Sequence, residues 1–124
     1  LFEDAIRTLR DNIGKEQETV ADTLFHIGLV RVALYDYEEA MSNLKDALKT
    51  QKKLLGAEHP ATLRTRREIG QLRALMDPKF DAHLDEFNDI LEIQKRIHGE
   101  RHPNVAETLH VIGCAQVRKG DQAL

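Results

Sequence analysis

The chain has 124 residues, of which 41% are apolar and 31% charged, and its net charge is −3. This balance is typical of a single folded domain, and it excludes both a disordered chain and the strongly basic surface of most nucleic-acid-binding proteins. Since no apolar run reaches the roughly 18 residues that cross a bilayer, we also expect no membrane insertion.

A terminal helix over residues 1–13 is the first predicted element. Gly14 predicts its end, and the polar residues 15–18 predict a loop. Gly56 and Gly99 follow at intervals of 42 and 43 residues, each after a helical pattern and before a short polar loop. Three landmarks at one spacing indicate an internal repeat. We therefore expect a piece of a longer repeat array, divided into a terminal helix at 1–14, repeats at 15–56 and 57–99, and a partial repeat at 100–124.

Each repeat predicts two helices, a first helix A and a second helix B. Helix A is expected to end at Tyr35, Met76 and Lys119 in the three copies, and helix B to begin near Tyr37 and near Phe80. The residues after Lys119 predict the start of another helix B.

Local signals mark the helix ends. Pro60 and Pro103 take the first helical position in two copies of helix A, where the missing N–H of proline is tolerated. Asp36 predicts the cap of the first helix B, with Glu39 as its reciprocal partner in a capping box. Gly56 predicts where that helix stops.

Glycines inside the A helices predict close helix packing. Gly28, Gly70 and Gly113 each follow an isoleucine in mid-helix, where glycine costs about 0.5–1 kcal/mol relative to alanine. That cost is offset if helix B approaches closely at the same point. Ala40 and Ala47 supply the small complementary surface on the first helix B.

Two sequence patterns carry a resemblance to a known family. Leu24-x-x-Ile27-Gly28 in helix A, followed by Asp36-Tyr37-Glu38-Glu39-Ala40 in helix B, resembles a tetratricopeptide repeat. The long unit, with loop stretches 53–60 and 96–103 that both contain His-Pro, is similar to the repeat of the kinesin light chain subfamily. The resemblance implies an all-α, right-handed α-solenoid of antiparallel helix pairs, with two full units and partial units at both ends. HEAT and armadillo repeats have similar periods and are the alternative architecture.

The same resemblance implies protein binding and no enzymatic activity. The A helices would line a concave groove that binds a partner protein or peptide, in a cargo-binding or adaptor role. The alternative is a structural scaffold held permanently in a multiprotein complex. Arg64 and Arg67 would give the groove a basic middle suited to acidic groups, unless they are only solvated and paired with neighbours such as Glu68. The implied groove residues are Asp22, Phe25, His26, Leu29, Arg64, Arg67, Gln71, Glu107, His110 and Val111.

Residues with metal or catalytic chemistry favour structural roles. His98 and His102 flank Gly99, whose helix break prevents a shared helical face, so we expect neither a metal nor a cofactor. His110 and Cys114 lie four residues apart on one face, but no orienting Asn/Asp and no oxyanion donor accompany them, so we expect no nucleophile. Cys114 is the only cysteine and favours a reducing, cytoplasmic location.

Overall fold

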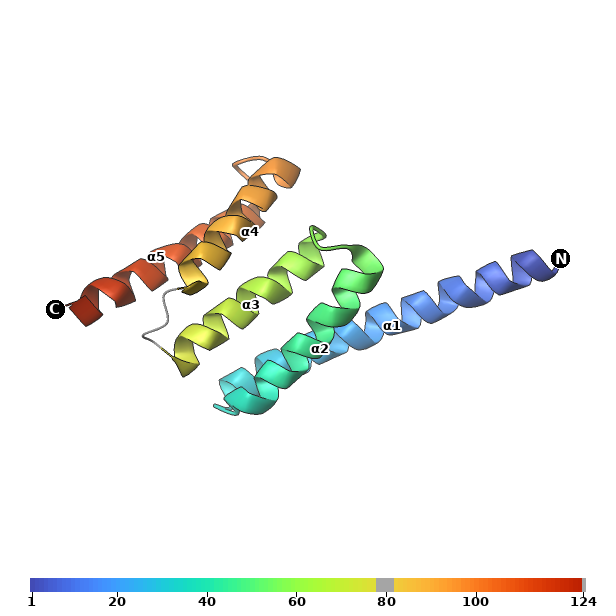
Figure 1. Ribbon diagram of the computed structural model, residues 1–124, viewed down its shortest axis with the longest axis horizontal. Coiled ribbons are helices and arrows are strands. Elements are labelled where there is room, and N and C mark those ends of the chain that lie inside the picture. Colours follow the sequence, from blue (N-terminus) through green and yellow to red (C-terminus); the bar gives the residue numbers. More distant parts are fainter. Residues whose placement is uncertain (78–81, 124) are drawn as a thin grey trace. The chain divides into compact units, whose positions relative to one another are not determined.

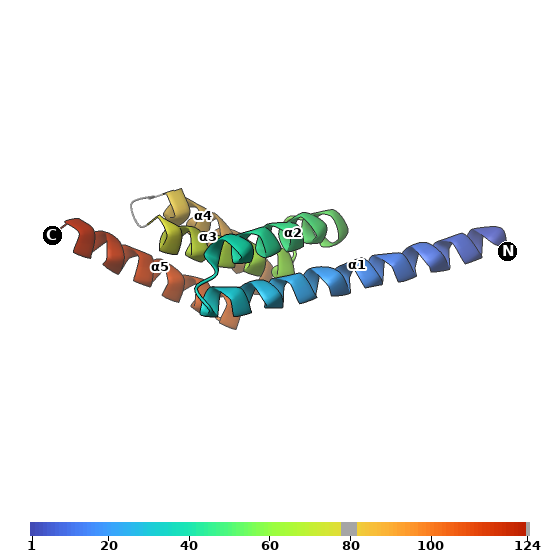
Figure 2. The ribbon, with the colours of Figure 1, turned by 90° about the horizontal axis from the view of Figure 1, so that it is seen from below.

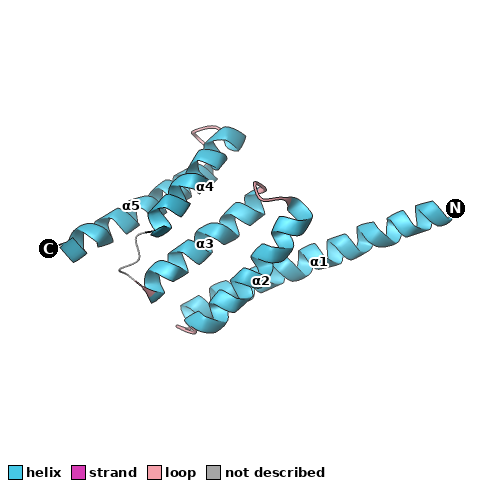
Figure 3. Cartoon of the chain, in the orientation of Figure 1, coloured by secondary structure: helices cyan, strands magenta, loops and turns pink. Residues whose placement is uncertain are grey.

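The computed structural model describes residues 1–77 and 82–123, and this part of the chain is helical with short connections (Figures 1 and 3). It contains no strand, so the predicted all-α fold is confirmed. The helices are α1 (Phe2–Ala33), α2 (Tyr37–Leu55), α3 (Pro60–Met76), α4 (Ala82–His98) and α5 (Pro103–Ala123). They form two compact units, Leu1–Thr65 and Arg66–Leu124, with the division inside α3.

Helix α1 is longer than the sequence predicted. It runs without interruption through Gly14 and through residues 15–18, so the predicted loop there is wrong. Glycine ends a helix efficiently when its backbone turns to positive φ, as Gly56 (φ +96°) and Gly99 (φ +82°) do here. Gly14 keeps a helical backbone, and no proline follows it to prevent continuation of the helix.

The loops after Gly56 and Gly99 end in a shared capping arrangement. Pro60 and Pro103 begin α3 and α5, as predicted. The preceding histidine accepts a hydrogen bond at Nδ1 from the backbone N–H two residues later, at 3.1 Å in both copies: Ala61 to His59 and Asn104 to His102. Each histidine therefore satisfies one of the N–H groups that an α-helix leaves without a partner at its start.

The turn between α1 and α2 differs from the predicted capping box. Asp36 occupies the N-cap position of α2, but its side chain makes no capping hydrogen bond. Instead Asp36 Oδ2 and Glu39 Oε2 each lie 3.4 Å from NH1 of Arg31. Arg31 stands in the last turn of α1 and reaches across the connection, so the two carboxylates bind this cation rather than backbone N–H groups.

Helix α3 ends where the sequence predicted, whereas helix α5 continues beyond its predicted end. Helix α3 ends at Met76, as expected. The expected start of a helix near Phe80 lies outside the described residues, and α4 is described from Ala82. Helix α5 continues through Lys119 as far as Ala123, so the expectation that a new helix begins after Lys119 is wrong for that stretch.

Two of the three mid-helix glycines mark close helix crossings. A Cβ atom added to Gly28 would lie 2.9 Å from the side chain of Leu44 and 3.4 Å from the carbonyl oxygen of Ala40, both on α2. A Cβ atom on Gly70 would lie 2.6 Å from the ring of Phe87 on α4. The predicted close approach is thus confirmed in each unit. Among the described residues, Gly113 has no neighbour within 4 Å of such an atom.

A buried polar pair joins consecutive helices in each unit. Thr65 on α3 hydrogen-bonds Gln51 on α2 at 2.6 Å, and Thr108 on α5 hydrogen-bonds Gln94 on α4 at the same distance. All four side chains are almost fully buried, so each pair satisfies polar groups that would be expensive to leave alone in the core.

Candidate functional site

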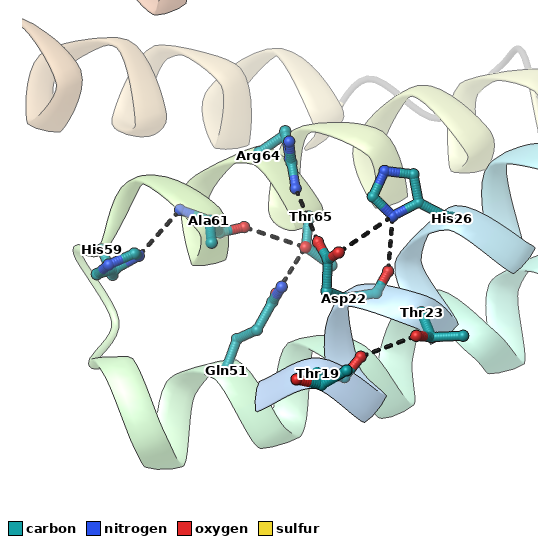
Figure 4. A network of polar contacts seen from close by, with 9 residues as sticks. All are labelled: Thr19, Asp22, Thr23, His26, Gln51, His59, Ala61, Arg64 and Thr65. Atoms are coloured by element: carbon teal, nitrogen blue, oxygen red, sulfur yellow. Dashed lines mark hydrogen bonds and ion pairs between the residues drawn. The ribbon is translucent and has the colours of Figure 1, made fainter. Parts of the chain in front are cut away.

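In the first unit, four of the predicted groove residues come together. Figure 4 shows Asp22 of α1 between His26, one turn further along the helix, and Arg64 of α3. Arg64 NH2 lies 3.6 Å from Asp22 Oδ1, and the guanidinium carbon lies 4.3 Å from the ring centroid of Phe25. His26 Nδ1 lies 2.8 Å from the backbone oxygen of Asp22 and 3.6 Å from its carboxylate. We name these four residues the α1 cluster.

The members of the α1 cluster differ in what they can offer a partner. Phe25 is only 2% exposed, so it is a core residue and not a groove contact, contrary to its predicted role. Its ring supports the cation of Arg64, which is the arrangement of a cation–π contact. Asp22 and His26 are exposed, and Arg64 is partly so. Leu29 lies three residues after His26 on α1 and is half-buried.

In the second unit, the remaining predicted groove residues line one open hollow between α3 and α5. The hollow has a volume of ≈ 510 Å³. We name it the α3–α5 hollow. Its lining residues are Arg67, Glu68, Gln71, Ala106, Glu107, His110 and Val111.

The five groove residues predicted for this part of the chain all line the α3–α5 hollow. Sequence reasoning missed Ala106, which follows Val105 in the first turns of α5.

Arg67 is held inside the α3–α5 hollow and is not a free cation. It is 5% exposed, its NH2 lies 2.9 Å from Glu107 Oε2, and its NH1 lies 3.4 Å from Thr108 Oγ1. A buried guanidinium requires such partners, because an unpaired charge in the core is strongly unfavourable. Val111 is 8% exposed and packs with Phe87, so it contributes mainly to the core beneath the hollow.

Arg66 points to a different surface from its neighbours. Its Nε lies 2.8 Å from Glu86 and its NH2 lies 2.9 Å from Asp89, both on α4. The hydrogen bond to Glu86 raises the pKa of Arg66, against the lowering effect of partial burial. Arg64, Arg66 and Arg67 therefore each have a carboxylate partner, and the basic groove middle expected from the sequence is largely neutralised within the chain.

The histidines and the cysteine form local pairs. The rings of His98 and His102 stack across the Gly99 loop with centroids 4.0 Å apart and planes inclined by 17°. Nearly parallel rings direct their nitrogen lone pairs side by side rather than toward one ion. Cys114 Sγ lies 3.7 Å from His110 Nε2, as their spacing predicted. Within the described ranges, no group of three or more His, Cys, Asp or Glu side chains is placed to hold a metal ion.

Comparison with known proteins identifies one segment. Residues 20–61 match the family model of the tetratricopeptide repeat, so this segment, from the second half of α1 to the start of α3, is a tetratricopeptide repeat. Such repeats generally mediate protein–protein interaction. No curated protein matches the chain. Over the part of the chain that the structure describes, no helix is both long and apolar enough to cross a membrane.

Proposed function

We propose that the chain is a protein-interaction module that binds a peptide segment of a partner protein in the α3–α5 hollow, in a cargo-binding or adaptor role like that of kinesin light chains. One observation carries this proposal: the groove residues expected in the second unit line a single open hollow. Its rim offers polar groups from Gln71, Glu107 and His110, and Ala106 and Val111 add apolar surface. This combination of an apolar surface with a few polar groups is typical of binding sites.

An acidic group on the peptide would bind by replacing Glu107 as the partner of Arg67. The Glu107 side chain is 61% exposed, while its partner Arg67 is 7% exposed. Glu107 is therefore free to swing toward solvent, whereas Arg67 stays in place. A carboxylate of the peptide would take the position of Glu107 on the guanidinium, whose planar fork suits that group.

The test is fluorescence-polarisation binding of acidic peptides to the full chain. Glu107→Gln weakens the internal competitor, so acidic peptides should bind several-fold more tightly. Gln71→Ala and His110→Ala should weaken binding by roughly tenfold together, which corresponds to about 1.4 kcal/mol. Glu92→Gln, at an exposed position of α4, is the matched control and should change nothing. Unchanged affinity in Glu107→Gln, Gln71→Ala and His110→Ala would contradict the proposed site.

The alternative function is a structural scaffold within a larger assembly. Exposed apolar side chains in the second unit favour it, among them Leu109 (48% exposed) and Val117 (64% exposed). A folded chain that binds no peptide would support this alternative. The single free cysteine, Cys114, supports a reducing, cytoplasmic location for either function.

A further inference from the structure

Helix α1 carries a long exposed apolar stripe. Its members lie three, four or seven residues apart, and their exposure ranges from 39% for Ile27 to 87% for Phe2. We name this set the α1 stripe. It consists of Phe2, Ile6, Leu9, Ile13, Val20, Ile27 and Val30, with Leu34 at the C-cap.

The α1 stripe is distinct from the face of α1 that packs in the first unit. The buried residues of α1 are Ala21, Phe25 and Gly28, and Leu44 of α2 packs at Gly28. At about 100° per residue, the stripe is centred roughly a third of a turn away from these three residues. Helix α1 therefore has two apolar faces, whereas a helix on the surface of a monomer needs only one. A long exposed apolar face marks an interaction site.

The stripe has the seven-residue period of paired helices. One position of this seven-residue period is aliphatic each time it recurs, at Ile6, Ile13, Val20, Ile27 and Leu34. The other position is mixed: Phe2, Leu9, Glu16, Thr23 and Val30. We propose that the α1 stripe pairs with the same stripe of a second copy of this chain, in antiparallel orientation.

Charge selects the antiparallel orientation. A parallel pair would place Glu16 against Glu16 of the second copy, and like charges in such a seam repel. The antiparallel pair with full overlap places Glu16 opposite Val20 of the second copy instead.

The surface beside the seam provides room and counter-charge. An open hollow of ≈ 610 Å³ lies between α1 and α2 at the middle of the stripe, where the two-fold axis of the pair would pass. Lys49 and Lys53 line it together with Glu16 and Asp46. The two lysines balance the charge of these two carboxylates, so Glu16 adds no net negative charge to the seam.

The shape of the first unit leaves α1 accessible. Figures 1 and 2 both show the N-terminal half of α1 projecting past the end of α2. In the antiparallel pair, each projecting half lies on the α1 stripe of the other copy. Helix α1 has 32 residues and is roughly 48 Å long, so a contact band about 10 Å wide buries on the order of 1,000 Å² in total. That area is at the low end for specific interfaces, and we expect micromolar association.

Sedimentation equilibrium of the full chain across the micromolar range tests the pairing. The wild type should show a monomer–dimer equilibrium. Ile13→Glu introduces a charge at an exposed stripe position without disturbing the core, and should weaken dimerisation at least about tenfold. Thr8→Glu adds the same charge to the same helix away from the stripe and should leave the equilibrium unchanged. A monomer at every concentration, or equal behaviour of the two variants, would overturn the proposal.

Disulfide trapping tests the orientation, in a Cys114→Ser background because Cys114 is exposed. The antiparallel seam sets Leu9 opposite Ile27 of the second copy. Leu9→Cys and Ile27→Cys should therefore form no dimer when each is oxidised alone, and should form one when mixed. Cross-linking of each variant by itself would show a parallel pair and overturn the proposed orientation.

Discussion

Two ion pairs that join α3 to carboxylates at equivalent positions of the repeat behave differently. Asp22 and Glu107 occupy matching places in α1 and α5, and each pairs with an arginine of α3. Arg64 lies 3.6 Å from Asp22 and its side chain is 42% exposed, whereas Arg67 lies 2.9 Å from Glu107 and its side chain is 7% exposed. An exposed pair contributes little to stability, but a buried guanidinium depends on its partners. Carboxylates at matching positions thus form an accessible pair in one unit and a structural pair in the other.

Other features repeat with equal geometry. The buried Thr–Gln pairs have the same hydrogen-bond length in both units, and so do the two histidine caps. Backbone and core positions therefore keep the repeat, while the surface pairs diverge.

Loss of a buried Thr–Gln hydrogen bond should have the largest effect on stability, and the effect should be equal in the two units. Thr65→Val and Thr108→Val each leave a buried glutamine oxygen without its threonine partner, so each should destabilise the fold by about 1–3 kcal/mol. Chemical denaturation followed by circular dichroism measures this. Thr8→Val, at an exposed position, is the control. A large difference between the two core variants would break the equivalence of the units.

A smaller effect should separate the two ion pairs. Glu107→Ala removes the carboxylate from a buried arginine and should cost about 1–2 kcal/mol. Asp22→Ala removes an exposed partner and should cost less than about 0.5 kcal/mol. Equal losses in the same denaturation experiment would contradict the distinction drawn between an accessible and a structural pair.

The smallest effect concerns the caps of α3 and α5. His59→Ala and His102→Ala each remove one acceptor for a backbone N–H, and each should cost about 0.5–1 kcal/mol. Asparagine at the same positions should restore most of the loss, because its side chain is a favourable cap. Failure of asparagine to restore stability would assign the loss to some other contact of the imidazole.

Sequence patterns located the helix ends where two local signals agreed. Gly56 and Gly99 are each followed by a His-Pro pair, and the structure ends one helix and begins another there. At Gly14 only the glycine was present, and the helix continues. A single glycine permits a helix end without requiring one, because it also adopts the helical conformation.

The structure brings several predicted groove residues together, but their contacts were not predictable. The family resemblance implied one face for Arg67, Gln71 and His110, and these residues line the α3–α5 hollow. Burial of Phe25 and pairing of Arg67 with Glu107 could not be read from the period. Both depend on contacts between residues about 40 positions apart in the chain.

By itself, the sequence determined the helical class and the repeat spacing, and it located the close helix crossings at Gly28 and Gly70. These properties follow from local conformational preference and from side-chain size. Only the tertiary structure decided which charges are neutralised, which apolar residues enter the core, and which face of α1 remains exposed. Those outcomes depend on the distance and orientation between helices, because burial and ion pairing require atoms of separate segments to meet.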